Sequence, residues 1–337
     1  MAYHGEQVPP HLLIKIEHRD DPVSAVAEQD ARQRARSYPT LMWGAPVFGC
    51  AEQIADGWRI ISLLSDQPQG ARDGLASYLR RLHAETADTT ANSAIREEYR
   101  SAYEKLDWEP VDETMAAGCR YRIIRAQTFI RMGPDGPEPP RPTDPDPYPP
   151  QDPAIRLSRF EGFVIDPAAA TGLSGALLRM EMAPAYHKSG TDVPDDVRAD
   201  SEAALISHPN VVILPACFTV GEQVDGRWRP RSTMTYATPQ GARDSATFSW
   251  TDVMPAEDAT HEEMMAAFRR ALAERKPPET DEFEVKGVRC RVTRVESFVR
   301  VGADGPEGPR PSDWDPDPPP ALHVQQLREQ GLMPDPD

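Results

Sequence analysis

Two strings of arginine residues are the groups in this sequence best suited to bind an anion. Four arginines fall between positions 120 and 131, and four more recur at the same spacing between 289 and 300. A guanidinium group binds a carboxylate or phosphate through two parallel hydrogen bonds, so several on one strand face could form an anion site. The candidate ligand-binding residues are Arg120, Arg122, Arg131, Arg289, Arg291 and Arg300.

The protein could also satisfy these arginines itself. An outward strand face is normally polar, and the chain has 54 acidic residues against 37 basic ones. Asp135, Glu138, Asp304 and Glu307 begin close to the ends of the two arginine strings. We favour this interpretation and expect arginines that face outward and are mostly neutralised within their own unit, each exposed pair contributing up to ~1 kcal/mol.

A proline-rich loop follows each arginine string. DGPEPPRPTDPDP begins at Asp135 and DGPEGPRPSDWDP at Asp304. Its carboxylates could hold calcium, but such a site needs several oxygens held at turns, and alternate prolines keep the chain straight. PPRP could dock in an aromatic groove of a protein partner. We favour a rigid strap that packs across its own unit, because proline lowers the entropy cost of ordering a loop.

The string PQGARD occurs twice, at 68–73 and 239–244. One glycine does not make a phosphate-binding loop. An Arg-Asp pair beside a turn is typical of a cap or a local ion pair, which is how we interpret Arg72 with Asp73. Trp58 and Trp228 each follow a predicted turn and are expected in a core or an interface.

Established catalytic and metal-binding motifs are absent from the sequence. His261-Glu262-Glu263 lacks the second histidine of a zinc-protease motif, and Gly172-Leu173-Ser174-Gly175 is shorter than a nucleophile elbow. We therefore predict no cofactor, no metal and no disulfide, and leave enzymatic activity open, because catalytic groups can assemble in space. The four cysteines are far apart in the sequence: Cys50, Cys119, Cys217 and Cys290.

These features occur twice because the chain matches itself over most of its length. FIRMGPDGPEPPRPTDPDP from Phe129 recurs as FVRVGADGPEGPRPSDWDP from Phe298, and ordered matches of this length indicate a duplicated unit. We predict an N-terminal tail at 1–20, a first repeat at 21–167, a partly helical connecting segment at 168–191 and a second repeat at 192–337. The fold class is α+β, a tandem duplication of a small antiparallel sheet packed with helices and related by a pseudo-two-fold axis.

Each repeat is predicted to contain a helix, a hairpin, a second helix, a long strand and the proline loop. Asp56-Gly57 and Asp225-Gly226 supply the hairpin turns, and Thr260 with Glu263 forms a capping box for the second helix. The apolar stripe of that helix is Met264, Phe268, Ala271 and Leu272, matched by Ile95, Tyr99, Ala102 and Tyr103.

The predicted boundaries follow from these local signals. The first helices cover 23–37 and 195–207, and the connecting helix covers 173–182. The second hairpin has strands at 211–224 and 228–236, and the long strands cover 119–132 and 288–301. The first 20 residues and the last four are expected to be frayed.

Composition excludes several classes of partner. The formal net charge of −17 argues against nucleic acid and against an anionic membrane surface, both of which need a basic protein face. No apolar run approaches the ~20 residues of a membrane span, and the N-terminus has no signal-peptide pattern. Scattered cysteines favour a reducing cytoplasm. The oligomeric state stays open.

PQGARD and the loop GPDGPEPPRPTDPDP, each with its second copy, resemble a family of uncharacterised actinobacterial proteins of the Streptomyces type with an internally duplicated domain. The resemblance covers most of the chain. It implies a bacterial, cytoplasmic protein and carries over no catalytic residues.

Two hypotheses of function follow. In the first, which we favour, the chain is a non-catalytic binding or scaffold protein whose two copies present similar faces. In the second, it is an enzyme or a small-anion-binding protein with a pocket at the seam between the repeats, lined by the arginines. The second hypothesis requires arginines that converge on a concave seam.

Overall fold

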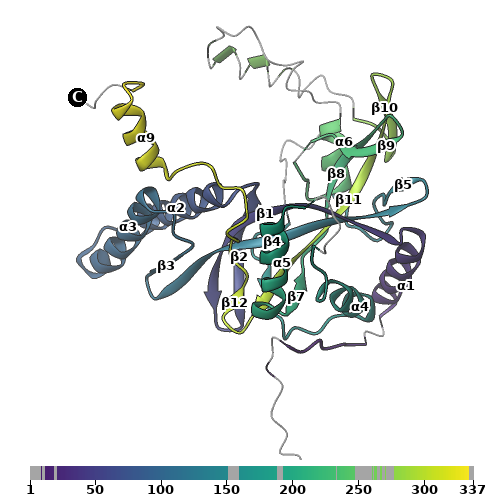
Figure 1. Cartoon of the computed structure of the whole chain (residues 1–337), viewed down its shortest axis with the longest axis horizontal. Helices are drawn as coiled ribbons and strands as arrows, with labels where there is room; N and C mark the ends of the chain where they lie inside the picture. The colour runs from purple at the N-terminus through teal and green to yellow at the C-terminus, as the bar shows by residue number, and fades with distance from the viewer. Residues whose placement is uncertain are drawn as a thin grey trace, which may run out of the picture.

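The fold is α+β, with helices packed on an antiparallel sheet, as predicted (Figure 1). The structure is a computed structural model, and it describes residues 9, 12–18, 21–150, 159–187, 193–232, 234–246, 260, 262–263, 266–267, 270 and 277–333. Residues 21–167 are called the first half below, and residues 192–336 the second half. Residues of the two halves that the sequence match aligns are called corresponding residues.

The described helices are α1 (Pro22–Ser37), α2 (Pro68–Glu85), α3 (Ser93–Trp108), α4 (Leu173–Met182), α5 (Asp195–Ser207), α6 (Pro239–Ala246) and α9 (Pro320–Glu329), with a 3-10 turn, η2, at Thr90–Asn92. The described strands of the first half and connecting segment are β1 (Thr40–Ile54), β2 (Gly57–Ser65), β3 (Glu113–Ala116), β4 (Cys119–Gly133), β5 (Gly136–Pro137) and β6 (Val164–Ile165). Those of the second half are β7 (Asn210–Ile213), β8 (Cys217–Val224), β9 (Arg227–Pro230), β10 (Glu282–Val285), β11 (Val288–Gly302) and β12 (Gly305–Pro306).

The long strands β4 and β11 lie side by side at the centre of the sheet. The strand order is β6-β2-β1-β4-β11-β8-β9, with β3 and β5 also paired to β4, and β7, β10 and β12 paired to β11. β4 and β11 run antiparallel, and Thr128 pairs directly with Ser297. These two are corresponding residues, 169 positions apart like Phe129 and Phe298. The pairing therefore places corresponding positions symmetrically about the Thr128–Ser297 pair.

The second-half hairpin forms with its predicted turn but with different strands. Asp225 and Gly226 both have positive φ, of 50° and 75°, as a tight hairpin turn requires. The predicted strand at 211–224 is wrong as one element, because it breaks between β7 and β8, where Pro215 has no N–H to give to the sheet. The return strand β9 ends at Pro230, well before the predicted residue 236.

Helix α2 was not predicted from the sequence. Pro68 occupies its first turn, and Ala71, Leu75 and Leu79 are buried along one side. Proline at the first helical position and apolar residues at a spacing of four are both helix signals. The helices α1, α4 and α5 lie within a residue of their predicted ranges.

In the second half, the capping box predicted at the start of the second helix is present. Thr260 N donates to Glu263 Oε2 at 2.8 Å, and Glu263 N donates to Thr260 Oγ1 at 3.3 Å. The stripe Met264, Phe268, Ala271 and Leu272 lies outside the described residues. In the first half, Ala102 on α3 is buried, Tyr99 and Tyr103 are partly buried against the same apolar cluster, and Ile95 is 39% exposed.

Two of the four apolar core clusters lie on opposite faces of β4. Ile123 packs with Phe48, Leu75 and Leu79 beneath α2 and α3. Ile124, the next residue along β4, points to the other face. That face holds a cluster with members from both halves: Trp58, Ile60 and Leu63 with Val212, Val299 and Val301. The second cluster makes the halves one hydrophobic unit, at about 1.5–3 kcal/mol for each fully buried large side chain.

The N-terminal segment is anchored over residues 12–18, so the prediction of fraying is wrong there. Glu17 N donates to Thr171 O at 2.9 Å, and Thr171 N donates to Lys15 O at 3.0 Å. Asn210 Nδ2 donates to Leu13 O at 3.1 Å. Residues 1–8 and 334–337 lie outside the described residues. Within the described part of the chain, every helix is too short or too polar to cross a membrane.

Candidate functional site

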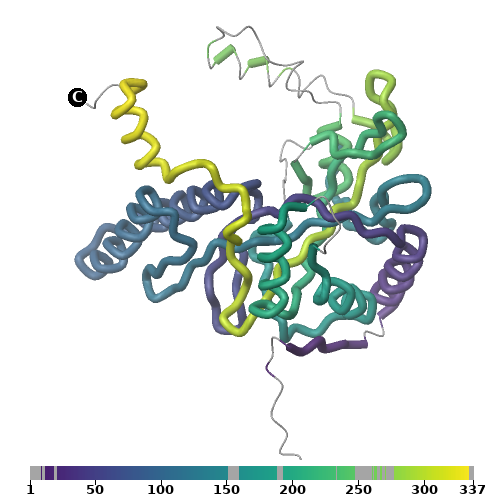
Figure 2. Tube along the Cα trace, in the orientation of Figure 1, coloured from purple at the N-terminus to yellow at the C-terminus, as the bar shows by residue number. Residues whose placement is uncertain are grey.

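Each proline loop packs on the other half as well as on its own, which corrects the prediction of a strap across its own unit. The backbone oxygen of Glu138 accepts a hydrogen bond from Arg294 N at 2.9 Å, and that of Glu307 accepts one from Arg125 N at 2.9 Å. Figure 2 traces the loop after β11 running beside β2 of the first half. The cause is the antiparallel β4–β11 pairing, which brings the end of each long strand to the other half.

A tryptophan of the opposite half covers each loop where it begins. A Cβ added at Gly305 would lie 2.3 Å from Trp58 Nε1, and one at Gly136 would lie 2.4 Å from Trp228 Nε1. Only glycine allows this approach, and both glycines also have positive φ, of 113° and 119°. The prediction that Trp58 and Trp228 lie in a core or interface is therefore confirmed.

The candidate arginines at the start of each long strand stack on these tryptophans. The guanidinium carbon of Arg122 lies 4.8 Å from the centroid of the Trp58 ring, and that of Arg291 lies 5.2 Å from the Trp228 ring. Arg120 and Arg289 lie 5.5 and 5.6 Å from the same rings. Such cation–π contacts contribute about 0.5–1 kcal/mol at exposed sites and more when dry.

Carboxylates from both halves neutralise Arg120 and Arg122. Arg120 Nε donates to Glu113 Oε1 at 2.6 Å within its own half, and its other nitrogens donate to Asp304 of the second half at 2.7 Å. Arg122 bonds the same two carboxylates. Hydrogen bonds from Arg120 and Arg122 hold the pKa of Asp304 well below its usual range. The prediction that the arginines are mostly neutralised within their own unit therefore fails for Arg120 and Arg122, which the two halves neutralise together.

The predicted outward orientation is wrong for the buried members of the set. Arg131, Arg291 and Arg300 are 6%, 4% and 3% exposed, because loops and helices cover the strand faces that the sequence alone suggested were free. Arg291 Nη1 donates to Pro137 O of the first half at 2.9 Å, and its Nη2 to Glu282 Oε1 at 2.6 Å. Arg289 remains at the surface, where it bonds Glu282 at 3.1 Å.

The repeated PQGARD strings meet the proline loops of the opposite half. Gln69 N, in the first turn of α2, donates to Asp315 Oδ1 at 2.8 Å, and Arg72 Nη1 donates to Asp315 Oδ2 at 2.6 Å. Gln240 N donates in the same way to Asp146 at 2.9 Å. A carboxylate at a helix N-terminus satisfies free N–H groups and the helix dipole. The prediction of a cap or local ion pair between Arg72 and Asp73 is wrong, since Arg72 pairs with Asp112 and Asp315 and Asp73 accepts from Gln69.

Buried ion pairs connect the loops to the long strands. Arg125 Nε lies 3.0 Å from Asp313 Oδ2, with the two side chains 4% and 5% exposed, and burial lowers the pKa of Arg125. Arg294 Nε lies 3.1 Å from Asp144 Oδ2. Both pairs join opposite halves, so the halves cannot separate without leaving buried charges unpaired.

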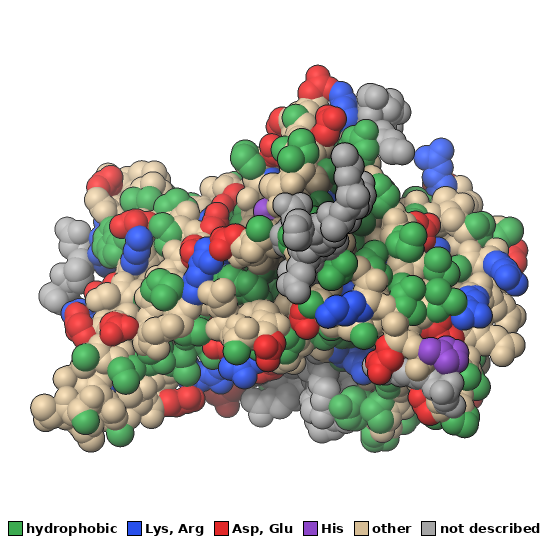
Figure 3. All heavy atoms as spheres, turned by 90° about the horizontal axis from the view of Figure 1, so that it is seen from below, with side chains coloured by type: hydrophobic (Ala, Val, Ile, Leu, Met, Phe, Trp, Pro, Cys, Tyr) green, Lys and Arg blue, Asp and Glu red, His purple; other side chains and the backbone are tan. Residues whose placement is uncertain are grey.

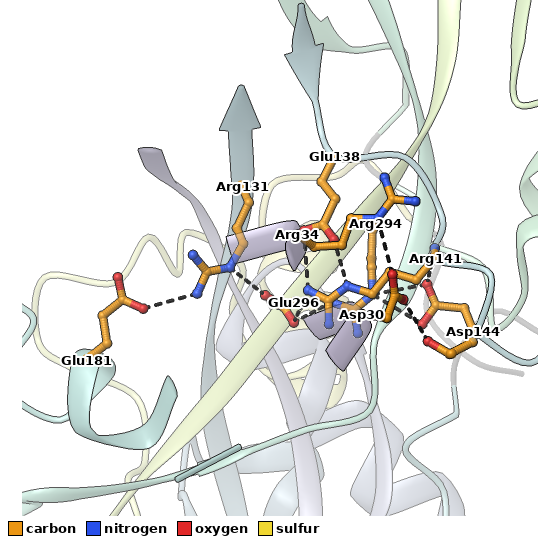
Figure 4. A network of polar contacts seen from close by, with 10 residues as sticks. Asp30, Arg34, Arg131, Glu138, Arg141, Asp144, Glu181, Arg294 and Glu296 are labelled. Atoms are coloured by element: carbon orange, nitrogen blue, oxygen red, sulfur yellow. Dashed lines mark hydrogen bonds and ion pairs between the residues drawn. The ribbon is translucent and has the colours of Figure 1, made fainter. Parts of the chain in front are cut away.

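A buried carboxylate, Glu296, lies among three arginines (Figure 4). It pairs with Arg294, with Arg141 at 3.8 Å and with Arg131 at 3.6 Å. Burial acts to raise the pKa of Glu296, but the arginines outweigh it and hold that pKa below its usual value. Arg131 also pairs with Glu181 of α4 at 3.0 Å.

Arg300, the counterpart of Arg131, is bound by backbone oxygens instead. Its Nη1 donates to Ala183 O at 3.0 Å and to His208 O at 3.4 Å, and its Nη2 donates to Ala185 O. Ala183 and His208 are the C-caps of α4 and α5, where a cation interacts favourably with the helix dipoles.

A cavity of about 240 Å³ lies at the seam, over the Thr128–Ser297 pair. It is lined by Val47, Leu63, Leu64, Asp66, Thr128, Phe160, Cys217, Met234, Thr235, Val295 and Ser297. Val47 and Cys217 are corresponding residues, like Thr128 and Ser297. Leu64 and Met234 are 53% and 40% exposed, so the cavity opens to solvent past them. None of the six candidate arginines is among its lining residues.

A family model for DUF5954, a family of unknown function, matches residues 21–316. The chain belongs to this family. The match begins where the first half begins and extends through the second proline loop. No curated protein and no solved structure matches the chain.

The described part of this DUF5954 chain holds no group of three or more histidine, cysteine or acidic side chains placed to bind a metal ion. Cys50, Cys217 and Cys290 are buried, Cys119 is partly exposed, and all four are free thiols. Burial raises the pKa of Cys50 and of Cys217 to about 11, so both stay protonated at neutral pH. Cys217 therefore contributes an apolar, polarisable surface to the seam cavity and is a poor nucleophile.

Proposed function

We propose that this protein is a non-catalytic binding protein built from two copies of one module, which holds a small, largely apolar and uncharged ligand at the seam. The observation that carries the proposal is the cavity across the Thr128–Ser297 pair, to which corresponding residues of the halves contribute. A duplicated chain is the covalent counterpart of a two-fold dimer, and the seam of such a dimer is a natural ligand site.

The internal duplication is supported by contacts that recur with the halves exchanged. Arg125–Asp313 has its counterpart in Arg294–Asp144. Gly305 beneath Trp58 has its counterpart in Gly136 beneath Trp228. Such reciprocity is expected when two copies of a module pack about a two-fold axis.

The lining of the cavity determines the class of ligand. Leu63, Phe160, Met234 and Val295 supply apolar surface, and hydroxyl groups are available for one or two hydrogen bonds. The Thr128 hydroxyl already donates to Ala45 O at 2.6 Å, so toward a ligand it acts as an acceptor. A dry cavity of about 150 Å³ can hold benzene, so 240 Å³ suits a compound of one or two rings.

The anion-binding alternative is weaker because five of the six candidate arginines have carboxylate partners. These partners are Glu113, Asp304, Glu181, Glu296 and Glu282. On the face drawn in Figure 3, acidic and basic side chains of the described residues lie interspersed. Guanidinium groups satisfied in this way have little left to offer a phosphate.

The remaining proposals concern origin and partners. We propose a bacterial, cytoplasmic, actinobacterial protein, in line with the resemblance carried by PQGARD and the proline loops. A protein partner could still contact the outer side of the second loop, where Trp314 is 69% exposed, although the inner side of that loop is occupied by the first half.

Thermal unfolding with indole as the probe tests the ligand proposal. At a concentration tenfold above its Kd, indole is expected to raise the melting temperature by about 2–4 °C. Leu64→Trp should remove this rise by blocking the mouth of the cavity. Leu177→Trp is the matched control, because Leu177 on α4 is 51% exposed and lies outside the lining of the cavity.

Equal rises in the wild type and in both variants would contradict binding at the seam. No rise in the wild type with indole, benzene or naphthalene would contradict an apolar ligand. Recovery of each probe unchanged after long incubation is expected of a binding protein, and chemical conversion would favour the enzymatic alternative.

A further inference from the structure

Two buried arginine clusters occupy corresponding places on the two sides of the seam, and they differ at one position. The corresponding pairs are Arg131 and Arg300, Arg141 and Arg310, Arg294 and Arg125, Glu138 and Glu307, Asp144 and Asp313, and Glu296 and Gln127. All twelve side chains lie on the long strands or the proline loops. In the last pair, the first cluster has the carboxylate of Glu296 where the second cluster has the amide of Gln127, which has the same shape.

In the first cluster, Glu296 completes the balance of charge. Arg294 has Asp144 at 3.1 Å, and Arg141 has Glu138 at 2.7 Å. Glu296 is the third carboxylate and is shared by all three arginines (Figure 4). Three guanidinium groups thus face three carboxylates of the cluster, and Glu181 of α4 adds a fourth at Arg131.

In the second cluster, the third carboxylate is missing. Arg125 has Asp313 at 3.0 Å, and Arg310 has Glu307 at 2.6 Å. Gln127 accepts from Arg125 at 3.3 Å, and its amide nitrogen donates to Gly44 O at 2.7 Å. Among the described residues, Arg300 has no carboxylate partner. Three buried guanidinium groups therefore face two carboxylates.

A small cavity lies beside Gln127, on the side of the seam that lacks the third carboxylate. Its lining includes Gln127, Arg300, Arg310 and Ser201, with Trp43 and Phe298 as apolar walls. Its volume of about 10 Å³ admits one particle of the size of a water molecule. Arg300 and Gln127 are 3% and 6% exposed, so a charge here is weakly screened by solvent.

The surroundings of this cavity are electropositive. The pKa of His187, another lining residue, is lowered first by burial and then by Arg125 and Arg310. The pKa of Arg300 is lowered to about 10, by burial and by the same two arginines against the opposing effect of Glu307. An added negative charge would relieve the repulsion among these groups.

We propose that the cavity beside Gln127 binds a single monatomic anion, of which chloride is the physiological example, in the role that the Glu296 carboxylate has on the other side of the seam. The guanidinium groups of Arg300 and Arg310 supply the positive charge, and Ser201 can donate a hydrogen bond. The small volume favours a monatomic ion over phosphate, sulfate and carboxylate compounds. The site is separate from the seam cavity, with which it shares no lining residue.

Thermal unfolding at constant ionic strength tests the site. Replacing sodium gluconate by sodium chloride, at tenfold above Kd, should raise the melting temperature of the wild type by about 2–4 °C. Gln127→Glu supplies the missing carboxylate from within and should abolish the difference between the two salts. Gln325→Glu is the matched control, since it adds the same charge at an exposed position of α9 outside the lining of this cavity and should keep the chloride effect.

No chloride effect in the wild type would mean that the cavity holds only water, and the proposal would be overturned. An undiminished effect in Gln127→Glu would place the anion elsewhere and overturn it equally. If Gln127→Glu does not fold, crystals of the wild type grown with sodium bromide decide the question. An anomalous bromide peak between Arg300 and Arg310 supports the site, and a map without that peak overturns it. Indole binding at the seam is unaffected by either outcome.

Discussion

Removing the Asp313 carboxylate from the second proline loop should destabilise the whole fold. Asp313 accepts from Arg125 Nε at 3.0 Å and from Arg310 N at 2.7 Å. Asp313→Ala leaves the Arg125 guanidinium, 4% exposed, with Gln127 as its nearest acceptor at 3.3 Å. Loss of one partner of a buried ion pair costs about 3–5 kcal/mol. Urea unfolding should show this as a lower midpoint with an unchanged m-value.

Two further variants test whether the lost ion pair causes this destabilisation. Glu97→Ala removes an exposed pair on α3, where Arg100 and Glu97 are 45% and 58% exposed at 2.6 Å, and should cost at most about 1 kcal/mol. Combining Asp313→Ala with Arg125→Met removes both charges and should recover part of the loss. A cost below about 1 kcal/mol for Asp313→Ala would refute the view that this carboxylate balances a buried charge.

Three further predictions concern the glycines, acid stability and the thiols. Gly305→Ala should cost about 1–3 kcal/mol more than Gly287→Ala in urea unfolding, because both have positive φ but only Gly305 meets an indole ring; equal costs would contradict the contact. The pKa of Asp304 is depressed by its two arginine partners from 3.8, so the stability it contributes is present above that pH and lost as the pH falls below it; Asp304→Asn should flatten the stability–pH curve between about 4 and 2. Native protein should react with a thiol reagent first at Cys119, the cysteine that is not fully buried, and denaturation should release the other three.

Elements with strong local signals were predictable from the sequence. The α5 range of 195–207 agrees with its prediction, and β4 and β11 each extend one residue beyond theirs, because helical and strand periodicities are properties of neighbouring residues. Helix α2 was missed although Pro68 and the spacing of Leu75 and Leu79 signal it. The break at Pro215 in the predicted second-half strand was equally readable and equally overlooked.

The sequence by itself determined that the arginines, the proline loops and the PQGARD strings occur in two matching sets. Which half each of them contacts was decided only by tertiary structure. The antiparallel β4–β11 register brings the end of each strand to the other half, and a pairing between strands 169 residues apart leaves no local pattern in the sequence. The same register buries Arg131, Arg291 and Arg300, which we expected to face solvent. Burial depends on what covers a strand face, and here the covering comes from distant parts of the chain.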